Sequence, residues 1–202
     1  MKSFMELAKE RYSVKGFSER KVEEEKLAQI LEAGNVAPTA KNNQPQRIYV
    51  LRSEEALKKA GELTVCTYGA STVLLFTYNQ QEIYVYPGDE AFDSGAEDVA
   101  IVATHIMLEA ADLGVGSCWV NRFEPAKAME LFELPENETP VLLMPLGYPK
   151  EGVGPLPNHT AKSTAAMKSS VLISGDAVRL GSPELSPVKD GSKASVTNPR
   201  SA

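Results

Sequence analysis

Three side chains near the N-terminus alternate in a pattern that suits the binding of an anion. In the stretch RYSVKGF, residues 11–17, one residue separates Arg11 from Ser13 and one separates Ser13 from Lys15. In an extended chain all three side chains project to the same side. That side then offers two cations and a hydroxyl without a carboxylate, which suits a phosphate. The alternative reading of these residues alone is a solvated basic turn.

The residues before this stretch bear on its conformation. SFMELAKE, residues 3–10, carries apolar residues at helical spacing, with Ser3 as the expected N-cap. If that helix continued, Arg11 and Lys15 would share a face as like charges, which is mildly destabilising. An extended segment after the helix avoids this repulsion.

The composition limits the classes of protein that the chain can represent. Its 202 residues are 43% hydrophobic and 24% charged, as in an ordinary globular protein with one sizeable core. A formal net charge of −6 and a pI near 5.1 argue against a general nucleic-acid or anionic-membrane binder. The two cysteines, Cys66 and Cys118, make no disulfide framework, and no apolar leader is visible at the N-terminus. We therefore expect a cytoplasmic protein whose basic site is local.

Helical and extended patterns alternate along the chain. Helices are expected at residues 21–34, 53–63, 93–113 and 124–134, with Gly34 ending the first, Ser53 capping the second and Pro125 near the start of the last. Strands are expected at residues 47–51, 71–79, 116–120 and 140–149, and residues 82–87 are either a short strand or irregular. From about residue 153 the composition shifts to Gly, Pro, Ser, Lys and Ala, with one apolar island at 169–174. Beyond 181 the tail is expected to be unstructured, or ordered only by docking.

The expected helix at residues 93–113 is apolar on most of its circumference, which places it in the middle of the fold. Asp98, Glu109 and Asp112 argue against a membrane span. His105 lies in the same helix and is expected to be a hydrogen-bonded core residue, because no other metal ligand stands at a useful spacing. No metal site is therefore expected.

Four stretches in a fixed order connect this chain to a known family. They are RYSVKGF (11–17), APTAKNNQPQ (37–46), LGVGSCW (113–119) and VLLMPLGYP (141–149). Together they resemble the nitroreductase family of FMN-dependent NAD(P)H oxidoreductases, over roughly residues 3–162. The resemblance implies an α+β fold, with a mixed, largely antiparallel sheet flanked by helices, assembled as an intertwined homodimer. It implies a domain at residues 1–165, and an atypical extension at 166–202 that either docks on the partner subunit or is disordered.

The resemblance also assigns cofactor contacts position by position. Arg11, Ser13 and Lys15 match the family residues that hold the phosphate and ribityl parts of FMN, and the backbone of Tyr12 would contact the cofactor beside them. The loop APTAKNNQPQ matches a segment that reaches flavin bound mainly by the partner subunit. Its matching positions are Pro38, Thr39, Ala40, Asn42 and Gln44. Here Gln46 follows Gln-Pro where the family often has Trp, so the loop is expected to pack differently.

Two later segments complete the implied site. Ser117, Cys118 and Trp119 match the segment that passes the flavin ring and offers backbone groups to it. Lys162, in PNHTAKS, would add a further cation at the phosphate, although the basic residues that usually follow are absent. From the residues alone, Cys118 is expected to be a small buried hydrophobe rather than a nucleophile, and the alternative for Trp119 is a core anchor.

The implied reaction is transfer of hydride from NADH or NADPH through flavin N5 to a small acceptor such as a nitroaromatic or a quinone. No side chain is assigned as a catalytic acid or base. The expected partners are a second copy of the chain and the small-molecule acceptor, without nucleic acid or membrane. Two alternatives stay open. One is a flavoenzyme of the same fold with other redox chemistry, such as dehalogenation or dehydrogenation, and the other is a non-catalytic flavin-binding dimer.

Overall fold

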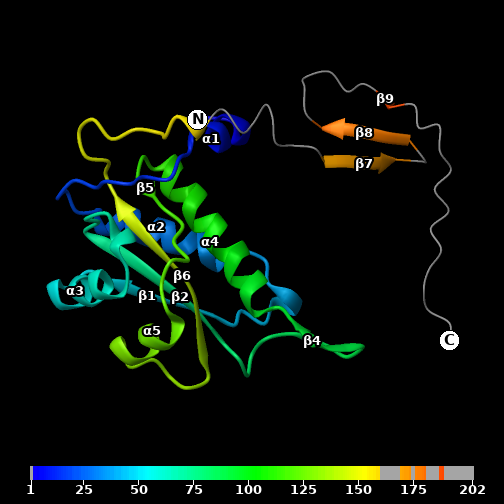
Figure 1. Cartoon of the computed structure of the whole chain (residues 1–202), viewed down its shortest axis with the longest axis horizontal. Coiled ribbons are helices and arrows are strands. Elements are labelled where there is room, and N and C mark those ends of the chain that lie inside the picture. Colours follow the sequence, from blue (N-terminus) through cyan, green and yellow to red (C-terminus); the bar gives the residue numbers. More distant parts are fainter. Residues whose placement is uncertain (1, 160–168, 174–175, 181–186, 189–202) are drawn as a thin grey trace. The chain divides into compact units, whose positions relative to one another are not determined.

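The computed structural model describes residues 2–159, 169–173, 176–180 and 187–188. The chain divides into two compact units, Met1–Pro155 and Leu156–Ala202, both drawn in Figure 1. None of the described helices has the length and apolar character needed to span a bilayer.

The first unit contains the expected alternation of helices and strands. Its helices are α1 (Phe4–Glu10), α2 (Glu24–Asn35), α3 (Glu54–Leu63), α4 (Gly95–Asp112) and α5 (Pro125–Leu131), with 3₁₀ turns η1 (Ala40–Asn42) and η2 (Val65–Thr67). Its strands are β1 (Gln46–Leu51), β2 (Thr72–Asn79), β3 (Val85–Tyr86), β4 (Asp89–Asp93), β5 (Gly116–Ser117) and β6 (Glu138–Gly147). The caps expected at Ser3 and Ser53 are confirmed, since their side chains accept from the backbone N–H groups of Glu6 and Ala56. Strand β5 is shorter than expected. Beyond it the N–H of Cys118 donates to the carbonyl oxygen of Pro145, and Val120 forms an isolated bridge with Leu143.

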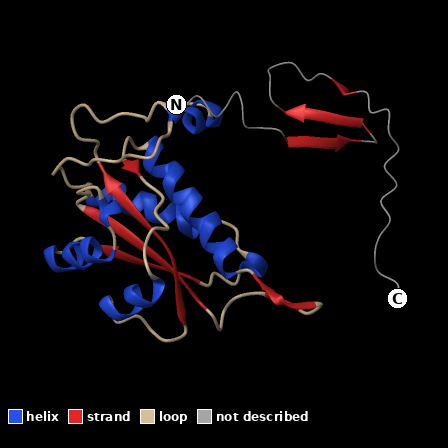
Figure 2. Ribbon diagram, in the orientation of Figure 1, coloured by secondary structure: helices blue, strands red, loops and turns tan. Residues whose placement is uncertain are grey.

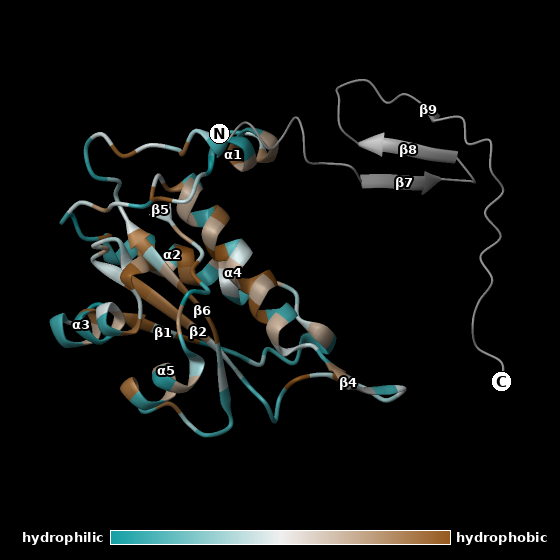
Figure 3. Ribbon diagram, viewed as in Figure 1, coloured by the Kyte–Doolittle hydropathy of each residue, from teal (hydrophilic) through white to brown (hydrophobic). Residues whose placement is uncertain are grey.

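A four-stranded sheet in the order β1-β2-β6-β5 forms the centre of this unit. All three pairings are antiparallel, and Figure 2 shows the sheet with helices on both sides. Strand β2 is buried on both faces: Leu74 and Phe76 point into one core, while Val73 and Leu75 point into the other. Figure 3 colours most of β2 and the later part of β6 as hydrophobic ribbon.

Each face of the sheet is covered by its own pair of helices. Helices α2 and α4 contribute Ile30 and Val102 to the core that contains Leu74. Helices α3 and α5 contribute Ala60 and Ala128 to the core on the other face. The expected α+β fold, a largely antiparallel sheet flanked by helices, is therefore confirmed (Figure 1).

The second unit contains a sheet that the sequence does not predict. Strands β7 (Ser169–Ile173), β8 (Asp176–Leu180) and β9 (Pro187–Val188) pair antiparallel in that order. The apolar island at 169–174 thus forms most of a strand. Strand β9 lies beyond residue 181, where the sequence predicts no independent structure.

Gly34 does not end its helix, contrary to expectation. Helix α2 continues to Asn35, and its C-cap Val36 has right-handed backbone angles. A Cβ atom at Gly34 would lie 2.8 Å from Cδ1 of Ile106 on α4. Glycine is needed here because the two helices approach closely, and a local pattern cannot distinguish this role from that of a helix stop.

His105 is hydrogen-bonded as expected, but it is not a core residue. Its side chain is half-buried, and Nδ1 lies 2.8 Å from the carbonyl oxygen of Ile101 one turn earlier. Ile101 itself is 38% exposed, so this side of α4 is not covered by the described part of the chain.

Replacing Gly34 by alanine tests the close approach of α2 and α4. Gly34→Ala is expected to destabilise the protein by about 1–3 kcal/mol through overpacking, measured by urea unfolding. Ile106→Val, which deletes Cδ1, should recover part of this loss in the double variant.

Gly61→Ala is the matched control, because nothing lies within 4 Å of a Cβ atom built at Gly61 in α3. This change should stabilise the protein by about 0.5–1 kcal/mol through helix propensity. A Gly34→Ala variant as stable as the wild type would contradict the helix-contact explanation.

Candidate functional site

The basic segment at residues 11–17 is extended, because α1 ends at Glu10. Arg11 already has extended backbone angles, φ −58° and ψ 132°, while its N–H still donates to the carbonyl oxygen of Leu7. From there the chain runs beside the sheet instead of continuing as a helix. The alternate side chains that suit an anion therefore occur on an extended backbone.

Pairing with strand β5 fixes the position of this segment relative to the sheet. Ser13 forms a parallel bridge with Ser117, and the N–H of Val14 donates to the carbonyl oxygen of Ser117 at 2.9 Å. The side chain of Val14 is 1% exposed and belongs to the core. A Cβ atom at Gly116 would lie 2.6 Å from Cγ2 of Val14, so glycine is required where the two segments meet.

Arg11 and Lys15 bring positive charge to the other side of the segment. The guanidinium of Arg11 is half-buried and contacts the sulfur of Met107, with Nη1 to Sδ at 3.7 Å. Lys15 is exposed. Within the described ranges, neither cation has a carboxylate partner at ion-pair distance. Together with the Ser13 hydroxyl they form a group with an unbalanced positive charge, which suits an anionic ligand.

Cys118 lies next to this group. Its side chain is 4% exposed, and burial raises the pKa of the thiol, while Lys15 and a hydrogen bond with Ser13 act in the opposite direction. Cys118 is thus a small buried residue at the edge of the positive group. Trp119 is half-buried against the core that contains Leu74, and its Nε1 donates to Oδ1 of Asn121 at 2.5 Å.

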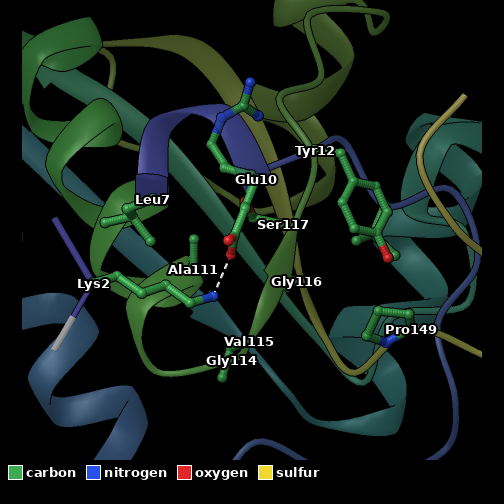
Figure 4. A pocket seen from close by; sticks show the side chains of 12 residues that line it. Lys2, Leu7, Glu10, Tyr12, Ala111, Gly114, Val115, Gly116, Ser117 and Pro149 are labelled. Atoms are coloured by element: carbon green, nitrogen blue, oxygen red, sulfur yellow. Dashed lines mark hydrogen bonds and ion pairs between the residues drawn. The ribbon is translucent and has the colours of Figure 1, made fainter. Parts of the chain in front are cut away.

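A pocket of about 180 Å³ borders the same segment (Figure 4). Figure 4 shows Lys2 and Glu10, which form an ion pair, across from Tyr12 and Pro149. The wall of the pocket also includes Arg11 and the β5 region. This volume is smaller than the roughly 300–1,000 Å³ of typical small-molecule sites. The pocket can therefore receive only part of a nucleotide-sized ligand.

The loop at residues 38–44 presents polar side chains from a strained backbone. Pro38, Asn42 and Gln44 are exposed, whereas Thr39 and Ala40 are half-buried. The φ angles of Lys41, Asn42 and Gln44 are 52°, 56° and 51°. Such angles are uncommon for non-glycine residues, and a cluster of them often occurs at a functional loop.

The loop and the basic segment are attached to different parts of α4. Arg11 contacts α4 at Met107, whereas the N–H of Ala40 donates to Asp98 near the start of the helix. At about 1.5 Å rise per residue, these two attachment points are roughly 13 Å apart along the helix. The structure thus brings together Arg11, Ser13, Lys15, Ser117 and Cys118, and it attaches the 38–44 loop at a separate point on α4. Lys162 lies outside the described residues.

Three residues that the sequence does not single out lie close to the same group. Tyr68 hydrogen-bonds Cys66 and lowers the pKa of its thiol; burial opposes this shift, while Thr64, Arg122 and Lys15 favour it. The same hydrogen bond, together with burial, raises the pKa of Tyr68 to about 12. Cys66 and Tyr68 are two residues apart at the end of η2, where Tyr68 has a left-handed backbone, so their contact is local. Only Arg122 approaches from a distant part of the chain, the segment after β5. In the part of the chain that the structure describes, no cluster of His, Cys, Asp and Glu could hold a metal ion.

Comparisons of the sequence and of the structure with known proteins find nitroreductases and related oxidoreductases. A model of the nitroreductase family matches residues 8–68 and 66–148. An Archaeoglobus fulgidus protein, a NADH dehydrogenase/NAD(P)H nitroreductase by name, is 31% identical over 159 residues, covering 75% of this chain and 88% of its own. The crystal structure of a nitroreductase family protein from Clostridium difficile 630 superposes with a TM-score of 0.74 at 35% identity, covering 78% of this chain and 91% of its own. The FMN reductase [NAD(P)H] of Bacillus subtilis is 24% identical over 156 residues, covering 69% of this chain and 63% of its own.

The contact between Tyr68 and Cys66 can be tested by thiol alkylation. Tyr68→Phe removes the hydroxyl that favours the thiolate, so the pKa of Cys66 should rise. Less thiolate is then present at a given pH below the pKa, and the pH–rate profile of Cys66 alkylation by iodoacetamide should move to higher pH. Peptide mass spectrometry separates Cys66 from Cys118. Tyr148→Phe, on the opposite core, should leave the profile unchanged, and an equal profile in Tyr68→Phe would contradict the assigned hydrogen bond.

Proposed function

This chain belongs to the nitroreductase family, and from that premise we propose that it is an oxidoreductase that binds FMN and takes hydride from NADH or NADPH. The acceptor in this proposal is a small oxidant such as a nitroaromatic or a quinone. The names of the relatives support the choice of cofactor and reductant, since they include NAD(P)H nitroreductase and FMN reductase [NAD(P)H]. Two free thiols in the chain agree with a reducing compartment, so we extend the proposal to a cytoplasmic location.

The observation that carries this proposal is the unbalanced positive group on the basic segment. Arg11 and Lys15 lack carboxylate partners in the described ranges, and Ser13 adds a hydroxyl between them. FMN ends in a phosphate dianion, which a planar guanidinium and an ammonium recognise well. The donor set therefore fits the phosphate end of this cofactor.

The remaining proposed contacts follow the path of the chain around the site. Ser117, Cys118 and Trp119 would offer backbone groups to the flavin ring, because the β5 segment runs directly beside Ser13. The exposed amides of Asn42 and Gln44 can donate and accept, as the carbonyl and N–H edges of the ring require. The full proposed set is Arg11, Tyr12, Ser13, Lys15, Pro38, Thr39, Ala40, Asn42, Gln44, Ser117, Cys118, Trp119 and Lys162.

The residues of this chain would bind and orient the cofactor and the reactants. When bound, FMN supplies the hydride chemistry through its N5 atom. The protein contributes charge at the phosphate and fixed hydrogen-bonding groups at the ring, which position reactants and reduce the entropy lost on reaching a reactive geometry. We assign no side chain as an acid or base.

A homodimer is part of the same proposal. One chain attaches the 38–44 loop and the basic segment to different parts of α4, and its pocket of about 180 Å³ is too small to enclose FMN. In the proposed dimer, each flavin lies between the basic segment of one subunit and the loop of its partner. The partly exposed α4 face at Ile101 is available for such a contact.

Flavin binding and reduction test the function directly. The purified protein is expected to bind FMN, and NADH or NADPH should bleach the flavin absorbance under anaerobic conditions. Arg11→Ala should weaken FMN binding about tenfold or more, because it removes charged hydrogen bonds, and Tyr12→Ala should weaken it less. Equal losses in the two variants would contradict the one-sided arrangement of the segment. Bound flavin that no nicotinamide reduces would favour the alternative redox chemistries.

Mixed dimers test whether two subunits share each site. Arg11→Ala and Asn42→Ala are each expected to weaken FMN binding at both sites of their own homodimers. A mixed dimer of the two variants, purified with different affinity tags, should regain one intact site of two, because one subunit keeps its basic segment and the other its loop. Titration with FMN would then show half the sites at wild-type affinity. No recovery in the mixed dimer would indicate that the loop serves its own subunit.

A further inference from the structure

A buried carboxylate connects the strained loop to the long helix. Asp98 is 2% exposed, and its Oδ1 atom accepts the N–H of Ala40 at 2.7 Å. Its other oxygen, Oδ2, accepts the hydroxyl of Ser94 at 2.7 Å. We propose that Asp98 is a positioning residue that sets the loop at residues 38–44 in the orientation required to contact flavin. The inference rests on the proposed function, because it concerns how that loop reaches the cofactor.

Among the described residues, hydrogen bonds and not a cation stabilise the carboxylate of Asp98. No lysine or arginine in the described ranges lies at ion-pair distance from it. Its charge is instead compensated by the N–H of Ala40, by the Ser94 hydroxyl and by its place in the first turn of α4. A buried charge without a cation is costly unless such groups stabilise it. Ala40 is the only one of these groups that belongs to the loop.

Ser94 supports a second, indirect attachment of the same loop, which runs through Tyr84. Its hydroxyl oxygen accepts the N–H of Tyr84 at 3.0 Å, and its own N–H donates to the carbonyl oxygen of Tyr84 at 2.9 Å. The ammonium of Lys41 lies 4.6 Å from the centre of the Tyr84 ring, at a distance typical of a cation–π contact. Asp98 and Ser94 therefore fix the loop at Ala40 directly and at Lys41 through Tyr84.

The attachment at Ala40 determines where the exposed amides point. The N–H of Asn42 donates to the carbonyl oxygen of Thr39, and the N–H of Gln44 donates to the hydroxyl oxygen of Thr39 at 3.1 Å. These bonds close residues 39–44 into a compact turn. Since Lys41, Asn42 and Gln44 have left-handed φ angles, the surrounding contacts must hold the turn in place. Asp98 thus acts on flavin through the loop, without touching it.

A double-mutant cycle tests this route. Asp98→Ala removes the acceptor, and Ala40→Pro removes the donor at the first position of a 3₁₀ turn, where the ring of proline is tolerated. Each single variant is expected to weaken FMN binding about tenfold, measured by quenching of flavin fluorescence. The double variant should also lose about tenfold, because both changes remove one interaction. A loss near a hundredfold would show that Asp98 acts by another route and would overturn the inference.

Two further variants separate positioning from simple loss of stability. Asp98→Asn keeps an oxygen that can accept from Ala40, so its FMN affinity should stay within about threefold of the wild type. Val102→Ala removes a buried side chain one turn further along α4 and should lower thermal stability while leaving FMN affinity unchanged. A tenfold loss in either variant would overturn the inference. If Asp98→Ala does not fold, the Ala40→Pro variant decides the question alone. Wild-type FMN affinity in Ala40→Pro would overturn the inference.

Hydrogen–deuterium exchange of the protein without added FMN gives a readout that does not depend on flavin. Asp98→Ala should speed exchange at residues 38–45 more than at residues 24–35 of α2, whereas Val102→Ala should not affect the loop selectively. Unchanged exchange in the loop of Asp98→Ala would overturn the inference. If the wild type fails to bind FMN, the proposed function fails, and the exchange measurement still decides whether Asp98 holds the loop. If the wild type binds FMN and Asp98→Ala binds it equally well, the inference fails and the proposed function stands.

Discussion

The pairing of β2 with β6 is the interaction on which the rest of the first unit depends. Residues 73–76 of β2 have no exposed surface, and the strand lies between β1 and β6. Each fully buried large apolar side chain contributes about 1.5–3 kcal/mol relative to an exposed one. Because the pleat sends alternate residues to opposite faces, one strand supplies both cores. The antiparallel ladder satisfies the backbone groups that this burial removes from water.

The pairing of β2 with β6 also determines the geometry of the candidate site. Strand β6 pairs with β5 through Gly147 and Leu146, and β5 in turn bridges to Ser13. The basic segment therefore needs no regular structure of its own. Its position depends on a glycine, Gly116, that lets the valine side chain of the segment pack against the sheet edge. The positive group lies where the sheet ends, and the core determines its orientation through Val14.

Helix α4 links the two halves of the proposed site. Near its start it bonds the loop through Asp98, and two to three turns later it contacts Arg11 through Met107. The helix can do this because its buried stripe, which includes Val102 and Ile106, packs on α2 and the sheet, while Asp98 and Met107 contact the loop and Arg11. A shift of α4 would therefore move the loop and the basic segment together. Gly34, where a Cβ atom would collide with Ile106 of α4, thereby bears on the geometry of the site from a distance.

The sequence by itself determined the features that depend on local physics. The helix caps at Ser3 and Ser53, the strand at β2 and the end of α1 before Arg11 follow from side-chain hydrogen bonds, apolar periodicity and charge repulsion between neighbours. The order of short motifs was also sufficient to identify the family and its fold. All of the cofactor contacts assigned from the motifs, from Arg11 to Lys162, remain predictions.

Only the tertiary structure decided the features that depend on residues distant in the chain. Gly34 serves a contact between helices, although its local pattern is that of a helix stop. Asp98 shares the buried stripe of α4 with Val102. A charged residue on such a stripe could have drawn attention to Asp98 in the sequence. Its partner Ala40 could not be predicted, because it lies 58 residues away. Arg122 approaches the thiol of Cys66 in the same way, from a distant part of the chain. Local periodicity specifies which face of an element is buried, but which residues meet on that face is set by how the elements pack.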